Sequence, residues 1–274
     1  MLLLSAPFEP SAGVPPGPPL RRYAQVGLAA AVVAGVGATI AVGAPARAGI
    51  GHGVAVGAIH AGLIAIGWLV ATGAAPGWPA PALRLGVTTI LASIAARLGP
   101  WGPLAFLLVP ALLIRETRGR PSMRAVGVDG ARLSHALIGL GAGAFLGAHL
   151  LITASLTFGY RVHATSGAAY LGALAYDVGV NVLSAEWLFR GALFTSWWRH
   201  GSFWPAALGT TALALVRYLL DPALPTASEA RAGAIFYLGL VGLSACALRA
   251  WSGSLLPGYL AGLAFFAAYR TLTP

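Results

Sequence analysis

Long apolar segments run through almost the whole chain, and they restrict its fold more than any other feature. The 274 residues are 58% hydrophobic and 9% charged, with a mean hydropathy of +0.79. A soluble domain carries about 25% charged residues, whereas a helix that crosses a membrane needs about 20 predominantly apolar ones. The sequence therefore predicts an all-α fold: a polytopic membrane helix bundle with about 8 transmembrane helices.

The predicted spans are separated by short polar or proline-containing segments. We expect them at residues 23–42, 54–72, 83–98, 103–114, 135–158, 170–187 continuing to 198, 202–219, 232–249 and 255–269. The third and fourth spans are short enough to be re-entrant or to pair differently.

Basic residues set the expected orientation and domain organisation. Arg21 and Arg22 lie at the edge of the first span, and further arginines gather between residues 115 and 133. Positive segments beside spans are typical of the cytoplasmic side, so we expect a multi-pass protein of the cell membrane with a cytoplasmic N-terminus. The expected parts are a flexible proline-rich tail (1–22), N-terminal transmembrane helices (23–114), a basic cytoplasmic loop (115–133) and a C-terminal transmembrane bundle (134–274).

The formal net charge of +10 does not by itself indicate a nucleic-acid partner. Outside the basic loop the arginines are scattered, and no aromatic residues interleave that loop to stack bases. The same loop suits contact with anionic lipid headgroups. We therefore predict membrane lipid as a partner and no nucleic acid.

Cysteine and histidine usage gives no indication of a metal site. Cys246 is the only cysteine, and the six histidines form no HExxH motif, so a cysteine-based metal cage is ruled out. We predict no metal and no cofactor. His60 and His149 lie inside apolar spans, where we expect them to hydrogen-bond to a neighbouring helix.

Polar residues gather in the second half of the chain, most of them on one predicted helix. Glu186 and Arg190 stand four residues apart in a very apolar stretch, where a charge at mid-membrane costs about 2.5–3.5 kcal/mol. This spacing fits either a functional site or a structural ion pair. Asp177, Asn181 and Ser184 line the opposite face, and for Asp177 and Asn181 we expect a hydrogen bond between helices.

The segment Ala185-Glu-Trp-Leu-Phe-Arg-Gly191 resembles the first motif, Glu-Glu-x-x-x-Arg, of the CAAX-protease and bacteriocin-processing (CPBP) family of glutamic-type intramembrane endopeptidases. Glu186, Phe189, Arg190 and Gly191 match that motif. Ala185 stands in place of the first glutamate, which in the family activates the water molecule. The resemblance covers residues 178–268, about a third of the chain, and is degenerate at the catalytic positions.

For the second and third family motifs, only the spacing and the flanking residues are similar, and the catalytic residue types are replaced. Arg217 or Tyr218 occupies the place of the histidine in Phe-x-x-x-His, with Leu213 or Ala214 in place of the phenylalanine. Gly262 and Phe266 replace the polar pair of the third motif, His-x-x-x-Asn or His-x-x-x-Asp, after the turn at residues 253–255. The resemblance therefore places the candidate catalytic positions at Glu186, Arg190, Arg217 and Tyr218.

These substitutions weaken the case for hydrolysis on physical grounds. Peptide hydrolysis needs a base for water and donors for the oxyanion, and each lost donor costs about 2.7–4 kcal/mol. Arg190 would make Glu186 a weaker base. Arg217 is a permanent cation that cannot act as a base, although it could hold an oxyanion or a peptide carboxylate.

Three hypotheses follow, so whether the chain is an enzyme stays open at this point. The first is a CPBP-like membrane protein with lost or much reduced proteolysis, acting as an accessory protein or binding a membrane-anchored peptide or protein. The second is an active intramembrane endopeptidase that uses Glu186 with His149 or His60, or with Arg217 as the electrophile. The third is a membrane scaffold or transporter.

Overall fold

The computed structural model describes residues 48–72, 77, 79–120, 123, 126–128, 132–163, 166–199, 201–219 and 228–273. Helices make up nearly all of this part, together with turns and one short antiparallel strand pair. The all-α fold is therefore confirmed for the described residues. The expected tail (1–22) and the first expected span (23–42) lie outside them.

Several described helices are long and apolar enough to cross a membrane. Within the described residues there are four: Gly49–Thr72, Leu133–Phe158, Gly167–Arg199 and Ala232–Ser252. Two further apolar helices, Pro79–Ala95 and Leu256–Tyr269, are shorter, and a helix of 17 residues is only about 25 Å long against a hydrocarbon core of about 30 Å. The count of about 8 spans stays a prediction.

The chain forms two compact units, and neither is one continuous stretch of sequence. The first unit contains the described residues of 48–123 together with Thr165–Leu188, and the second contains those of Arg124–Ala164 and Phe189–Pro274. From residue 48 onward, where the described part begins, the chain passes between the units three times. Composition alone marks only the basic segment 115–133 as a boundary.

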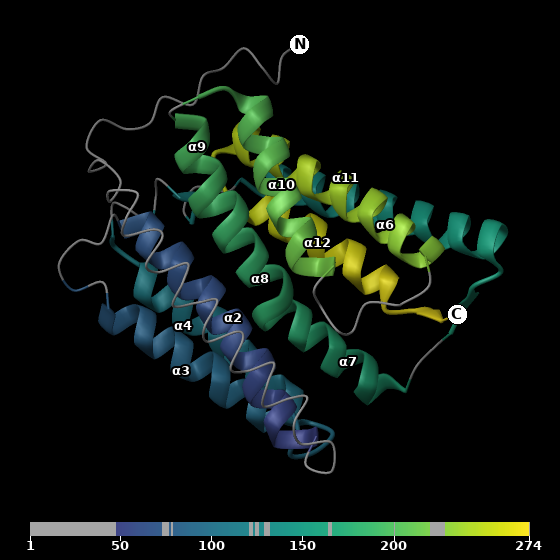
Figure 1. The fold of residues 1–274 in the computed structure, drawn as a ribbon, viewed down its shortest axis with the longest axis horizontal. Helices are drawn as coiled ribbons and strands as arrows, with labels where there is room; N and C mark the ends of the chain where they lie inside the picture. The colour runs from purple at the N-terminus through teal and green to yellow at the C-terminus, as the bar shows by residue number, and fades with distance from the viewer. Residues whose placement is uncertain are drawn as a thin grey trace. The chain divides into compact units, whose positions relative to one another are not determined.

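Helices of the first unit pack closely where small residues face each other. Its elements are α2 (Ala48–Thr72), α3 (Pro79–Ala95), the 3₁₀ helix η2 (Gly102–Leu107), α4 (Leu108–Thr117), α7 (Gly167–Tyr176), the π-helical η3 (Asp177–Asn181) and α8 (Val182–Ala185). Figure 1 shows α2, α3 and α4 side by side. A Cβ added to Gly57 of α2 would lie 2.7 Å from the Cα of Ile90 in α3, so the glycine permits this approach.

The second unit contains the remaining helices and the strand pair. Its elements are α6 (Leu133–Phe158), the strand β1 (Arg161–Val162), most of the π-helical η4 (Glu186–Phe194), α9 (Thr195–Arg199), α10 (Phe203–Leu219), α11 (Ser228–Ser252), α12 (Leu256–Tyr269) and the strand β2 (Leu272–Thr273). The strands β1 and β2 pair antiparallel, with Val162 opposite Leu272. Gly253, with a φ of 70°, separates α11 from α12 in a left-handed conformation that favours glycine.

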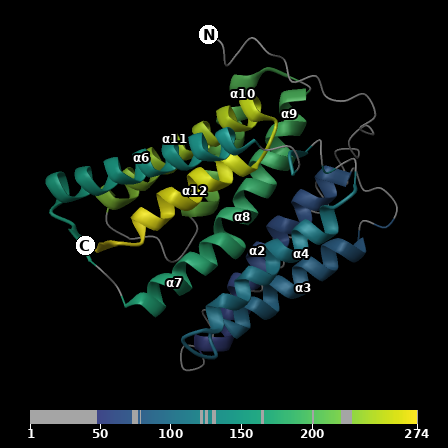
Figure 2. The same cartoon turned by 180° about the vertical axis from the view of Figure 1, so that it is seen from behind.

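Small residues form the contact between α6 and α12, which lie along each other in both views (Figures 1 and 2). Gly139, Gly143 and Gly147 are buried at intervals of four on α6. A Cβ on Gly143 would overlap the carbonyl oxygen of Ala261 in α12, and one on Gly147 would lie 2.7 Å from the Cβ of Ala268. This is the small-xxx-small pattern by which membrane helices approach closely.

The helix that carries Glu186 is continuous from α7 to α9 but is not α-helical throughout. Residues Asp177–Asn181 and Glu186–Phe194 are π-helical, so their backbone bonds join each residue to the fifth one along. Such segments inside α-helices are frequent at functional sites. The two π-helical segments contain Asp177, Asn181, Glu186 and Arg190. No pattern in the sequence predicts where these segments occur.

Candidate functional site

Glu186 and Arg190 are both inside the protein. Their exposed fractions are 5% and 3%, and both belong to the π-helical segment η4. Ala185, the residue in place of the first motif glutamate, is 1% exposed. Residues 185–191 are all buried, as a site inside a helix bundle requires.

The guanidinium of Arg190 is packed against a neighbouring helix, α11. Gly242 of α11 faces it so closely that an added Cβ would overlap Nη2 of Arg190. The same Cβ would lie 2.8 Å from the Cγ2 of Thr211 in α10. Arg190 therefore packs against α11 within the second unit, and Gly242 provides the space for its guanidinium.

A second polar cluster joins the helix that carries Glu186 to α2, within the first unit. The Oγ of Ser184 lies 2.8 Å from Nδ1 of His60, and the hydroxyl of Tyr176 lies 3.0 Å from Nε2 of the same ring. His60 and Ser184 are buried. Both nitrogens of the His60 ring thus have hydroxyl partners, which fixes the ring and stabilises the buried imidazole.

Asp177 and Asn181 also lie buried on this face. Asn181 Nδ2 donates to Asp177 Oδ1 at 2.8 Å, which is a bond within one helix, and the bond between helices that the sequence suggests for these residues stays a prediction. The contact between helices comes from Ser184 and Tyr176. The sequence does not single out Tyr176, because a tyrosine at the end of an apolar stretch has no distinguishing pattern.

Trp187 fixes the same helix against α2. Its Nε1 donates to the carbonyl oxygen of Ile64 at 3.1 Å, and its ring centroid lies 6.0 Å from that of Trp68. A Cβ on Gly67 would lie 2.5 Å from Nε1 of Trp187, so this glycine provides the space for the indole. The residue after Glu186 is therefore rigidly held.

Arg217 and Tyr218 lie in the last turn of α10 and are half-buried. The Cζ of Arg217 is 4.4 Å from the centroid of the Tyr218 ring, within the range of a cation–π contact. The Tyr218 ring lies 5.8 Å from that of Phe266 in α12. The structure thus brings Tyr218 and Phe266 together as an aromatic pair, and the resemblance places these residues at the expected second and third motifs.

The four candidate catalytic residues divide between the units. Arg190, Arg217 and Tyr218 belong to the second unit, and Glu186 belongs to the first. His149, one of the two histidines considered as a base, has its Nδ1 2.7 Å from the hydroxyl of Tyr237 in the second unit. Within the described residues there is no group of three or more metal-ligating side chains.

Among the described residues, the sequence does not single out two buried charged side chains, Glu116 and Arg249. Arg249 of α11 is 3% exposed and its guanidinium lies against Gly127, whose carbonyl oxygen accepts a bond of 2.8 Å from the backbone of Leu255. The sequence places Arg249 at the end of a span. Its burial cannot be predicted, because the sequence does not show that the segment around residue 127 covers this side chain.

No protein-family model, no curated protein and no solved structure matches this chain.

Proposed function

We propose that the chain is a multi-pass membrane protein of the CPBP type that has lost most or all proteolytic activity and binds a membrane-anchored peptide or protein without cleaving it. The proposal includes a bundle of about 8 transmembrane helices, a place in the cell membrane and a cytoplasmic N-terminus. Its family part rests on the run Glu186–Gly191 and the turn at residues 253–255.

The strongest support for lost proteolysis is the chemistry around Glu186. The position where the family has its water-activating glutamate is a buried alanine, Ala185. The imidazole of His60, the histidine that contacts the same helix, has both nitrogens in contact with hydroxyl groups. A general base must have a nitrogen or carboxylate oxygen within hydrogen-bond reach of the water that it activates. Both nitrogens of His60 instead contact the hydroxyl groups of Ser184 and Tyr176.

One observation favours the alternative of an active endopeptidase. His60 meets Ser184, which precedes Glu186 by two residues on the same helix. A water molecule in place of the Ser184 hydroxyl would lie within reach of Nδ1 of His60, close to Glu186. Under this alternative Glu186 and His60 together would activate water, and loss of either would abolish cleavage.

The test is cleavage by wild type and Glu186→Gln, reconstituted in liposomes with a set of single-span synthetic peptides. We expect the same background of products from both proteins, measured by mass spectrometry. Photocross-linking of the same peptides should persist in Glu186→Gln and fall about 10-fold in Arg217→Gln, because a charged hydrogen bond contributes about 1.5–3 kcal/mol.

Two results would change the proposal in different ways. Products that wild type makes and Glu186→Gln does not would establish the endopeptidase. Cross-linking at the level of a peptide-free control in every variant would remove peptide binding from the proposal. Thermal melts of each variant verify that the protein is folded.

A further inference from the structure

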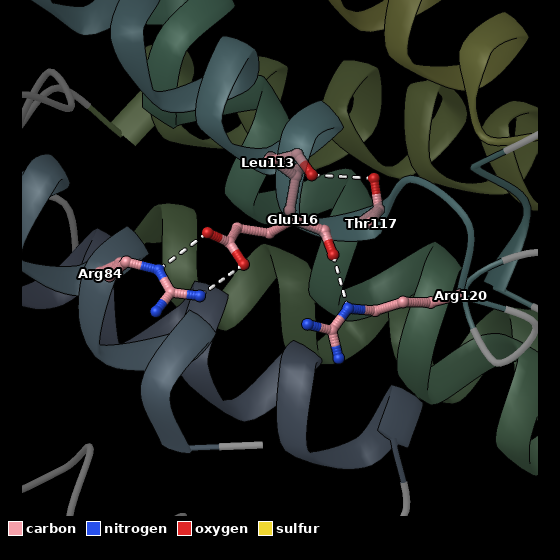
Figure 3. Close-up of polar contacts among 5 residues, drawn as sticks. All are labelled: Arg84, Leu113, Glu116, Thr117 and Arg120. Carbon is pink, nitrogen blue, oxygen red and sulfur yellow. Dashed lines mark hydrogen bonds and ion pairs between the residues drawn. The ribbon is translucent and has the colours of Figure 1, made fainter. Parts of the chain in front are cut away.

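An ion pair ties the C-terminal end of α4 to α3, outside the polar clusters described above (Figure 3). Nε and Nη2 of Arg84 donate to the two carboxylate oxygens of Glu116 at 2.8 and 2.7 Å. Arg120 Nε donates to the backbone carbonyl oxygen of Glu116 at 2.7 Å, and its Cζ lies 5.6 Å from the ring of Trp68. Three helices of the first unit therefore contribute to this end: α2, α3 and α4.

Positive charge dominates at this end. The hydrogen bond from Arg84 lowers the pKa of Glu116 below its usual range, and the charges of Arg120 and Arg115 act in the same direction. Glu116 therefore supplies one negative charge among four arginines. Arg84, Arg115, Arg118 and Arg120 are all exposed, and we call these four residues the arginine end.

Exposed apolar side chains lie directly beside the arginine end. Leu83, Val87 and Leu91 follow one another at intervals of four on α3, and the first and last are 68% and 60% exposed. Residues four apart lie on the same side of a helix. Ile114 of α4, next to Arg115, is 63% exposed. A basic surface thus continues into an apolar stripe.

We propose that the arginine end binds the phosphate of an anionic phospholipid whose acyl chain lies along the apolar stripe of α3. Arg84 is held in a forked bond to Glu116 through Nε and Nη2, which leaves Nη1 to donate to a ligand. Guanidinium groups suit the planar, bidentate recognition of phosphate.

The combination of basic and apolar surface favours a phospholipid over simpler roles for the same residues. Arginines at a helix C-terminus interact favourably with its dipole, which accounts for Arg118 and Arg120 but not for the apolar stripe. An apolar stripe alone suits any hydrocarbon chain. Anionic lipid headgroups attract nearby basic side chains, and an anionic phospholipid provides both a phosphate for the arginines and a chain for the stripe.

The test uses the full chain in an uncharged detergent, titrated with phosphatidylglycerol or phosphatidylcholine and followed by native mass spectrometry. The variant is Arg115→Gln/Arg118→Gln, because both side chains are exposed and the forked bond from Arg84 to Glu116 stays intact. The matched control is Arg97→Gln/Arg161→Gln, which removes the same charge from exposed sites outside the basic segment 115–133.

We expect wild type and the control to prefer phosphatidylglycerol, and the variant to bind it roughly 25-fold more weakly with unchanged phosphatidylcholine binding. Each lost arginine removes about 1 kcal/mol of attraction to the anionic headgroup, which for two arginines converts to this factor. Three results would overturn the proposal: equal affinity for the two lipids, an equal loss in variant and control, or displacement of the lipid by inorganic phosphate at similar concentration. The second would indicate attraction by net charge alone, and the third a site for a soluble anion.

Discussion

Gly143→Leu is expected to disrupt the contact between α6 and α12 and to lower the unfolding free energy by more than about 3 kcal/mol. The reason is the backbone of α12: a Cβ on Gly143 would overlap the carbonyl oxygen of Ala261. Backbone cannot move aside as a flexible side chain can, so the two helices must separate. Thermal unfolding in detergent, followed by circular dichroism, measures the loss.

The same helix offers a matched control. Gly141 lies two residues earlier on α6, is exposed, and an added Cβ there would meet no atom within 4 Å. Gly141→Leu should leave the melting temperature within a few degrees of wild type, since surface substitutions usually change stability by about 0.5 kcal/mol or less. Equal losses from both substitutions would show that α6 does not use this face.

The second large effect concerns the two buried charges of η4. On the interpretation of this spacing as an ion pair, we expect Arg190→Ala and Glu186→Ala each to cost about 3–5 kcal/mol, because removing one partner of a buried pair leaves the other charge uncompensated. The double variant should cost less than the sum of the two by about 0.5–3 kcal/mol. Thermal melts of all three variants in the same detergent provide the cycle.

Part of the stability lost in Arg190→Ala comes from lost packing, and the double variant shows this part because its charges no longer matter. The guanidinium lies against Gly242 of α11, so the double variant stays less stable than wild type. Strict additivity of the two single variants would contradict the coupling and leave the charges as independent buried groups.

Long apolar segments with few charges are sufficient to locate the long helices. The predicted spans 135–158 and 232–249 agree with α6 and α11 to within a few residues at most ends. For the helix with Glu186 the sequence predicts residues 170–198, and this helix runs through Gly167–Arg199. A long apolar segment has few alternatives to a helix, which explains this success.

The polar contacts cannot be predicted in the same way. His60 and Ser184 are 124 residues apart, and no local pattern selects one serine among many as the partner of a histidine. The sequence places Glu116 in a loop, whereas the structure places it in α4 and pairs it with Arg84 of α3. Apolar spacing also misses the π-helical turns, because it does not reveal which carbonyl each amide bonds to.

The proposed function requires that the helix Gly167–Arg199 crosses the membrane and places Glu186 inside it. Its 33 residues would span about 50 Å, more than the hydrocarbon core of about 30 Å. Cys246, the only cysteine, is buried, so Cys246→Ala provides a background for single cysteines at the exposed residues Ser166 and Ser202.

The decisive measurement is labelling of Ser166→Cys and Ser202→Cys in sealed vesicles with a maleimide that cannot cross the bilayer. We expect one cysteine to react in sealed vesicles and the other to react only after the membrane is permeabilised. Reaction of both cysteines before permeabilisation would place the two ends of the helix on one side of the membrane and contradict the proposed transmembrane position of Glu186.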